Sequence, residues 1–144
     1  MIYPSSFIDY CDSLQMKLSA LRKEVLYILW HAQKPLKAYE ILERLLTTKA
    51  NSKPPTVYRS LDFLVNLGVA HKIESIQSYT LCCKPDAHLN SELLMVCTYC
   101  RQVTELHDAA FQLLVMELAQ KTNFRLKEDT IELKGLCSLC QDQT

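Results

Sequence analysis

The sequence predicts an α+β protein in which an N-terminal winged helix-turn-helix precedes a small C-terminal α/β unit. Residues 19–66 hold three segments whose apolar side chains recur at helical spacing. Residues 69–83 follow with two short, partly alternating runs, the pattern of a β-hairpin. Residues 93–133 then combine short strand-like runs with one long helical segment. Three helices followed by a hairpin form the outline of a winged helix, and the later segments indicate a second, smaller unit.

The composition indicates a globular chain. Of its 144 residues, 49% are hydrophobic and 22% are charged, so it can bury a core and is not disordered as a whole. No apolar run approaches the ~20 residues of a membrane helix, and residues 1–14 lack the Lys and Arg of a secretory signal. We therefore expect a cytoplasmic protein with no membrane partner. Disulfides are rare in that compartment, so its seven cysteines favour metal or thiolate chemistry.

The three helical segments have recognisable ends. Ser19 is a suitable N-cap for a helix over residues 19–31, and a second helix is expected over residues 37–46. A Pro-Pro pair opens the third helix, over residues 55–66, because proline fits a first turn that does not use its N–H. Gly68 suits the exit from this helix.

The hairpin is expected to join residues 69–74 to residues 78–83. Residues 84–90 contain a proline and are expected to form a linker. The chain therefore divides into residues 1–84, the winged-helix domain, and residues 85–144, the second domain.

The second domain is expected to begin with strands over residues 93–97 and 102–106. A helix follows over residues 108–121, and a third strand is expected over residues 124–133. The apolar stripe of this helix consists of Phe111, Leu114, Val115 and Leu118.

The net charge of zero hides an asymmetry between the two halves. Residues 1–84 hold 11 basic and 7 acidic residues, a balance of +4, whereas residues 85–144 hold 5 basic and 9 acidic residues, a balance of −4. A basic half is suited to a polyanion such as DNA. A difference of this size is also compatible with ordinary scatter, so charge alone does not decide the partner.

The third helix is the candidate recognition helix. Val57, Leu61 and Leu64 fall on one face and are expected to pack inward, which turns Tyr58 and Arg59 elsewhere near the start of the helix. In helix-turn-helix proteins this part of the second motif helix enters the major groove, where Arg reads guanine. The alternative is an exposed Tyr-Arg pair that covers the rim of the core. The candidate DNA contacts are Tyr58, Arg59, Lys53, Lys37 and Thr56.

Two CxxC pairs are the strongest chemical signal. Cys97 and Cys100 form the first pair, and Cys137 and Cys140 form the second. Two such turns supply four thiolates, the tetrahedral set that zinc accepts as a closed structural site with no open position for catalysis. The alternative is a thioredoxin-like redox pair, which expects a βαβ setting that neither pair has. We expect structural zinc.

A second, mixed group of metal-ligand residues lies around the hairpin and linker. His71, Cys82, His88 and Glu105 would bind Zn²⁺ with no net charge, and a thiolate favours zinc over iron or manganese. The alternatives are that His71 is a buried core histidine and that one of the two adjacent cysteines is merely a small buried side chain. Spacing leaves open whether Cys82 or Cys83 is the ligand. The remaining candidate residues are Cys83 and His107.

These residues resemble a known family. The run KPPTVYRSLDFL over residues 53–64, VAHKIES over 69–75 and SYTLC over 78–82 are similar to the ferric uptake regulator superfamily, and most similar to its zinc uptake regulator branch. Both CxxC pairs fall where this family places its structural zinc. The resemblance covers roughly residues 18–141.

The resemblance implies a homodimeric bacterial repressor, not an enzyme, whose C-terminal α/β domain is the dimerisation domain. It implies two Zn²⁺ ions per subunit: a structural one at the four cysteines and a regulatory one at His71, Cys82, His88 and Glu105. The regulatory zinc would lock the dimer in a DNA-binding orientation on an AT-rich palindromic operator of zinc uptake genes. No small-molecule substrate is implied.

Departures from the family pattern leave alternative functions open. Ala20 stands where members often have proline, the stretch over residues 88–97 is slightly longer than usual, and no His-rich run precedes the first CxxC pair. A same-class rival is an iron or peroxide sensor. A rival of another class is a zinc enzyme in which Glu105 is the general base, and a third is a zinc-stapled protein-interaction module.

Overall fold

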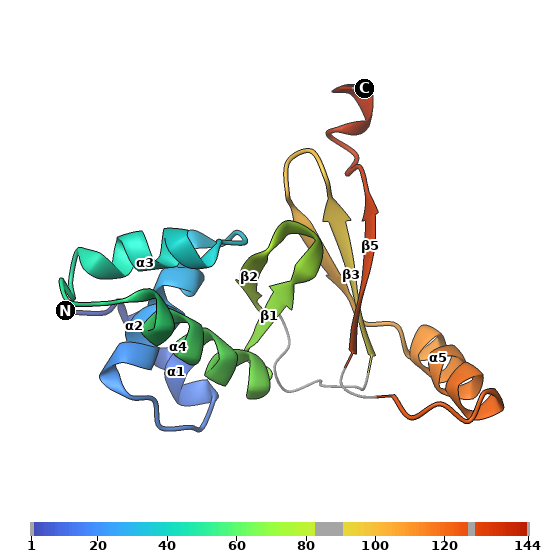
Figure 1. Ribbon diagram of the computed structural model, residues 1–144, viewed down its shortest axis with the longest axis horizontal. Coiled ribbons are helices and arrows are strands. Elements are labelled where there is room, and N and C mark those ends of the chain that lie inside the picture. Colours follow the sequence, from blue (N-terminus) through green and yellow to red (C-terminus); the bar gives the residue numbers. More distant parts are fainter. Residues whose placement is uncertain (1, 83–90, 127–128, 144) are drawn as a thin grey trace. The chain divides into compact units, whose positions relative to one another are not determined.

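The computed structural model describes residues 2–82, 91–126 and 129–143. The chain forms two compact units, Met1–Pro85 and Asp86–Thr144 (Figure 1). The expected linker, residues 84–90, lies outside the described residues. Among the described helices, none combines the length and the apolar character that a membrane crossing requires.

Four helices build most of unit 1: α1 (Ser5–Ser13), α2 (Ala20–Ala32), α3 (Ala38–Leu46) and α4 (Pro54–Asn66). The predicted helices α2, α3 and α4 are confirmed, with ends that differ by at most one residue. Helix α1 was not predicted. It buries only Phe7 completely, so its nine residues show no repeating apolar stripe.

The ends of these helices follow their sequence signals. The Ser19 hydroxyl accepts a hydrogen bond from the Arg22 N–H at 3.3 Å, which confirms Ser19 as the N-cap of α2. Helix α4 begins at Pro54 and is followed by Gly68 with φ of 79°, in the left-handed region that favours glycine. The predicted exit is therefore confirmed.

A β-hairpin completes unit 1. Strand β1 (Ala70–Ile73) pairs antiparallel with β2 (Ser78–Leu81), and a 3₁₀ turn over Glu74–Ile76 joins them. Strand β1 ends one residue earlier than predicted because Glu74 begins this turn, which Gln77 closes in the left-handed conformation, and β2 begins at Ser78 as predicted. An isolated bridge between Leu36 and Tyr79 attaches β2 to the segment before α3.

The core of unit 1 lies between α2, α3 and α4. Complete burial of an aliphatic side chain contributes about 1.5–3 kcal/mol, so this cluster supplies much of the unit's stability. Its fully buried members include Phe7, Val25, Leu26, Ile41, Leu45, Val57, Leu61 and Leu64.

Unit 2 is a three-stranded sheet with one helix. Strand β3 (Ser91–Cys97) is central, with β4 (Val103–Leu106) antiparallel on one side and β5 (Asp129–Gly135) parallel on the other. Helix α5 (Ala109–Lys121) makes the connection from β4 to β5. Parallel neighbours require such a crossover, so the order of elements agrees with the α/β character predicted for this unit.

One expectation for unit 2 is wrong. The third strand begins at Asp129, not at residue 124, because the N–H of Phe124 donates to the carbonyl of Ala119 and so completes the end of α5. The apolar stripe of α5 is not buried within the chain: Leu114 is 51% exposed and Leu118 is 53% exposed. In Figure 1, α5 extends away from the sheet of unit 2.

Candidate metal centre and nucleic-acid interface

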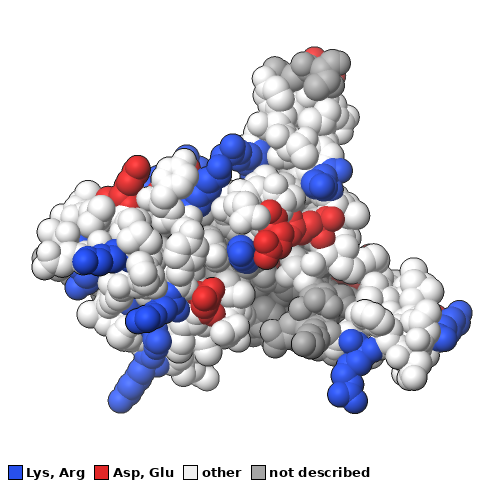
Figure 2. Space-filling model, viewed as in Figure 1, with Lys and Arg blue, Asp and Glu red and all other residues white. Residues whose placement is uncertain are grey.

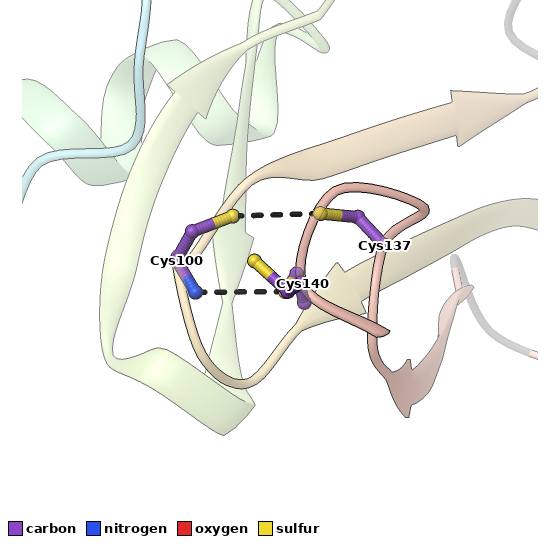
Figure 3. Close-up of side chains that lie close together, drawn as sticks. Cys100, Cys137 and Cys140 are labelled. Carbon is purple, nitrogen blue, oxygen red and sulfur yellow. Dashed lines mark hydrogen bonds between the residues drawn. The ribbon is translucent and has the colours of Figure 1, made fainter. Parts of the chain in front are cut away.

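The register of the sheet in unit 2 brings the two CxxC pairs together. Cys97 is the last residue of β3, and its partner in the parallel strand β5 is Gly135. Both strands end at the same edge of the sheet, so the turn that holds Cys100 lies beside the turn that holds Cys137 and Cys140. Figure 3 shows the sulfurs of Cys100, Cys137 and Cys140 pointing toward one another.

The spacing of the four sulfurs fits a tetrahedral metal ion. The Sγ atoms of Cys97, Cys100, Cys137 and Cys140 lie within 4.8 Å of one another, and those of Cys100 and Cys137 are 3.8 Å apart. A zinc ion with four thiolates at ≈ 2.3 Å has edges of ~3.8 Å between sulfurs. The donor set therefore fits Zn²⁺ with little rearrangement and leaves no position for a reacting water.

Two of these cysteines have opposite electrostatic surroundings. The backbone N–H of Cys100 donates to the Cys97 sulfur at 3.5 Å and, with the backbone N–H of Cys137, lowers the pKa of Cys97 to about 6. Burial raises the pKa of Cys140 to about 12. At neutral pH the centre thus offers one thiolate in advance, and metal binding must displace a proton from Cys140.

The hairpin of unit 1 places two residues of the mixed group on one face. His71 lies on β1, and the N–H of Cys82, just after β2, donates to the carbonyl of Val69 at 2.8 Å. With His71 opposite Thr80, the side chains of His71 and Cys82 are diagonal neighbours. Both residues are buried.

Unit 2 contributes the acidic member of the mixed group. Glu105 lies on β4, and its Oε1 is 3.3 Å from Nε2 of His107, two positions further along. Both side chains are largely buried. His88 and Cys83 lie outside the described residues.

The start of α4 exposes the residues predicted to contact DNA. Val57, Leu61 and Leu64 are fully buried, so this face packs inward as predicted. Tyr58 is 50% exposed and Arg59 is also exposed. The other candidates lie at helix starts: Lys53 is the N-cap of α4 and exposed, Thr56 is half-buried in its first turn, and Lys37 is the half-buried N-cap of α3.

A further exposed aromatic residue escaped the sequence analysis. Tyr39, in the first turn of α3, is 59% exposed and, with Tyr58, is one of two strongly exposed aromatic side chains among the described residues of unit 1. The signal for this residue in the sequence was an apolar side chain on the outer face of an amphipathic helix. Figure 2 shows lysine and arginine side chains spread over the helices of this unit.

Comparisons with known proteins identify the family. The model of the ferric uptake regulator family matches residues 13–134. The chain belongs to the ferric uptake regulator family. It is 35% identical to the zinc uptake regulation protein of Escherichia coli over 130 residues, covering 90% of this chain and 76% of the relative. It is 27% identical to the ferric uptake regulation protein of Neisseria meningitidis over 113 residues, covering 77% and 76%.

Solved structures of this family have the same fold. A zinc uptake regulator complexed with zinc and DNA matches with a TM-score of 0.84 and 33% identity, covering 96% of this chain and 93% of that one. The crystal structure of holo XcZur matches with a TM-score of 0.83 and 31% identity, covering 96% and 99%. These relatives are transcription regulators, which argues against the enzyme considered above.

Proposed function

We propose that this family member is a zinc-dependent, DNA-binding transcriptional repressor of zinc uptake genes that acts in the bacterial cytoplasm. The observation that carries the proposal is its greater likeness to zinc regulators than to ferric regulators, over a larger share of the chain. The presence of a buried thiol, Cys82, in the mixed group supports zinc over iron as the sensed metal.

Each subunit would hold two zinc ions with different roles. Cys97, Cys100, Cys137 and Cys140 supply a closed set of four thiolates, which suits an ion that is retained for folding. His71, Cys82, His88 and Glu105 would hold the regulatory ion. These four donors supply two nitrogens, a sulfur and an oxygen, and their charges balance that of Zn²⁺.

The regulatory ligands belong to both units, and this suggests how zinc controls DNA binding. His71 and Cys82 are on the hairpin of unit 1, whereas Glu105 is on β4 of unit 2. Joint coordination would fix one orientation of the DNA-reading unit. If that orientation also suits the operator, zinc and DNA each tighten the binding of the other by the same factor.

The apolar surface of unit 2 supports a homodimer. Helix α5 exposes Leu113, Leu114, Met116 and Leu118, and only Gln112 of this helix is buried. A helix that is apolar on most sides is normally covered. We propose that a second copy of the chain covers this helix. Each chain also carries a DNA-reading unit, and a palindromic operator would bind two such units, one at each half-site.

Each DNA-reading unit would place the start of α4 in the major groove of one half-site. Arg59 and Tyr58 are exposed there and would contact base edges, whereas Lys53, Lys37 and Thr56 would contact phosphates. Phosphate contacts add affinity without sequence choice, so discrimination falls to Arg59 and Tyr58. An AT-rich palindromic operator is the expected target.

The experiment that tests this function is a gel shift with controlled free zinc. The protein, retaining its structural metal, is titrated against a duplex that it has selected from a random pool, with iron and manganese in parallel. Submicromolar zinc should switch binding on, and a chelator should switch it off. Activation by iron or manganese would instead support the iron-sensor rival, and selective binding that no metal affects would refute metal sensing.

A further inference from the structure

A buried carboxylate connects helix α2 to the turn before α4. Glu24, on α2, is 5% exposed, although acidic side chains are seldom buried unless they are paired. Its Oε1 accepts a hydrogen bond from the Thr48 hydroxyl, and its Oε2 lies 3.7 Å from Nζ of Lys49. Both partners belong to the segment between α3 and α4. Since a buried carboxylate requires such partners, Glu24 holds this segment against α2.

The same segment leads directly into the first turn of α4. The Lys49 N–H donates to the carbonyl of Leu45 at 2.8 Å, and the Lys49 carbonyl accepts from the Ser52 N–H at 3.0 Å. The next residue, Lys53, is the N-cap of α4, and its carbonyl accepts from the Thr56 N–H at 3.0 Å. Short hydrogen-bonded turns therefore connect the partners of Glu24 to the start of α4.

We infer that Glu24 is a positioning residue for DNA recognition. Through Thr48 and Lys49 it sets the position of the first turn of α4, and hence the aim of Tyr58 and Arg59 at base edges. The ion pair between Glu24 and Lys49 also holds the Lys49 ammonium toward the protein. Without this pair, the ammonium would be free to contact DNA phosphates, and such contacts carry no sequence information. This inference rests on the proposed DNA-binding function.

The test compares Glu24→Gln with the parent chain on two duplexes, at saturating free zinc. One duplex is selected from a random pool by the parent protein, and the other has random sequence. We expect Glu24→Gln to lower affinity for the selected duplex about tenfold, while affinity for the random duplex is unchanged or higher. A mere loss of stability lowers the active fraction and weakens both together, so the ratio of the two affinities isolates the positioning role.

A matched control and a second variant sharpen the test. Asp9→Asn removes the same charge from an exposed position on α1 and should leave the ratio unchanged. Thr48→Val keeps the shape of the side chain but removes the donor to Glu24, so it should lower the ratio even if Glu24→Gln fails to fold. If the residues act as one unit, the double variant should lose no more than the larger single effect.

The outcomes separate this inference from the function on which it rests. Ratios within twofold of the parent in the folded variants would overturn it, as would fully additive effects in the double variant. Faster amide exchange at Thr56 and Val57 in both single variants would support it, because these amides donate to the Lys53 carbonyl. A parent protein that does not discriminate between the duplexes refutes the DNA-binding function itself, before any substitution is made.

Discussion

Cys97 and Gly135 face each other across the parallel strands β3 and β5. This register places the two CxxC turns at one edge of the sheet, although 36 residues, 101–136, separate Cys100 from Cys137 in the chain. Along the chain, helix α5 and strand β5 therefore lie between the two CxxC pairs of one candidate zinc centre. Loss of that centre should release the end of β5 from the end of β3.

Replacement of one ligand tests the structural role of this centre. Cys137→Ser should remove one zinc ion per chain and destabilise unit 2, because structural zinc contributes directly to folding free energy. Metal analysis together with thermal unfolding measures both effects. Ser138→Ala, a change within the same turn, should alter neither zinc content nor the unfolding temperature. Retention of full zinc content in Cys137→Ser would contradict the assignment.

The pH dependence of zinc binding at the four cysteines should reflect their different pKa values. Burial raises the pKa of Cys140 to about 12, so this thiol must release a proton at neutral pH and zinc affinity falls as pH is lowered. Hydrogen bonds from the backbone N–H groups of Cys100 and Cys137 lower the pKa of Cys97 to about 6. Below pH 6 its thiolate also takes a proton, so the slope of log affinity against pH should steepen by about one unit there. Competition with a chromophoric chelator across pH 5–8 measures this slope.

Cys82→Ser should separate zinc sensing from folding. The substitution keeps the size of the side chain but replaces the one thiolate of the regulatory set, so the fold, the dimer and one zinc ion should remain. Zinc-dependent binding to the selected duplex should be lost or shifted to at least tenfold higher free zinc, by the usual effect of a lost ligand. Cys11→Ser, in α1, is the matched control. A full zinc response in Cys82→Ser would show that Cys82 is not a ligand of the regulatory zinc.

Arg59→Ala and Lys53→Ala should weaken DNA binding in different ways. Loss of a bidentate base contact costs about 1–3 kcal/mol and relaxes sequence preference, so Arg59→Ala should bind the selected and random duplexes more nearly alike. Lys53→Ala should weaken both by a similar factor and reduce the salt dependence by about one phosphate contact. Binding isotherms at several salt concentrations measure both effects. Unchanged discrimination by Arg59→Ala would refute its role as a base contact.

Leu118→Glu should dissociate the dimer. This side chain is exposed on α5 in the single chain, so a charge there would cost little in a monomer and several kcal/mol in an apolar interface. Sedimentation velocity should show monomers at concentrations where the parent chain is dimeric. Gln120→Glu introduces the same charge at another exposed position of α5 and should have a smaller effect. Equal dissociation by both variants would argue that added charge, not the apolar contact, is responsible.

Elements with local causes could be predicted from the sequence alone. Helices α2, α3 and α4 have apolar periodicity and recognisable first residues, and their predicted ends differ by at most one residue from the observed ones. The inward face of α4 followed from the spacing of Val57, Leu61 and Leu64. The CxxC spacing likewise marked four cysteines that the structure brings together. Their role as zinc ligands stays a prediction, as do the DNA contacts and the regulatory set.

Features that depend on contacts between distant parts of the chain could be found only in the folded structure. Helix α1 has too few buried residues to show a period, and it is held by the aromatic contacts of Phe7 with Tyr27 and Trp30. The sequence shows that α5 is rich in apolar residues, but it does not show whether another part of the same chain covers them, and Leu114 and Leu118 are exposed in the structure. The burial of Glu24 arises from partners 24 and 25 positions away. Local spacing specifies local geometry, whereas packing between elements determines which of these surfaces and polar groups are enclosed.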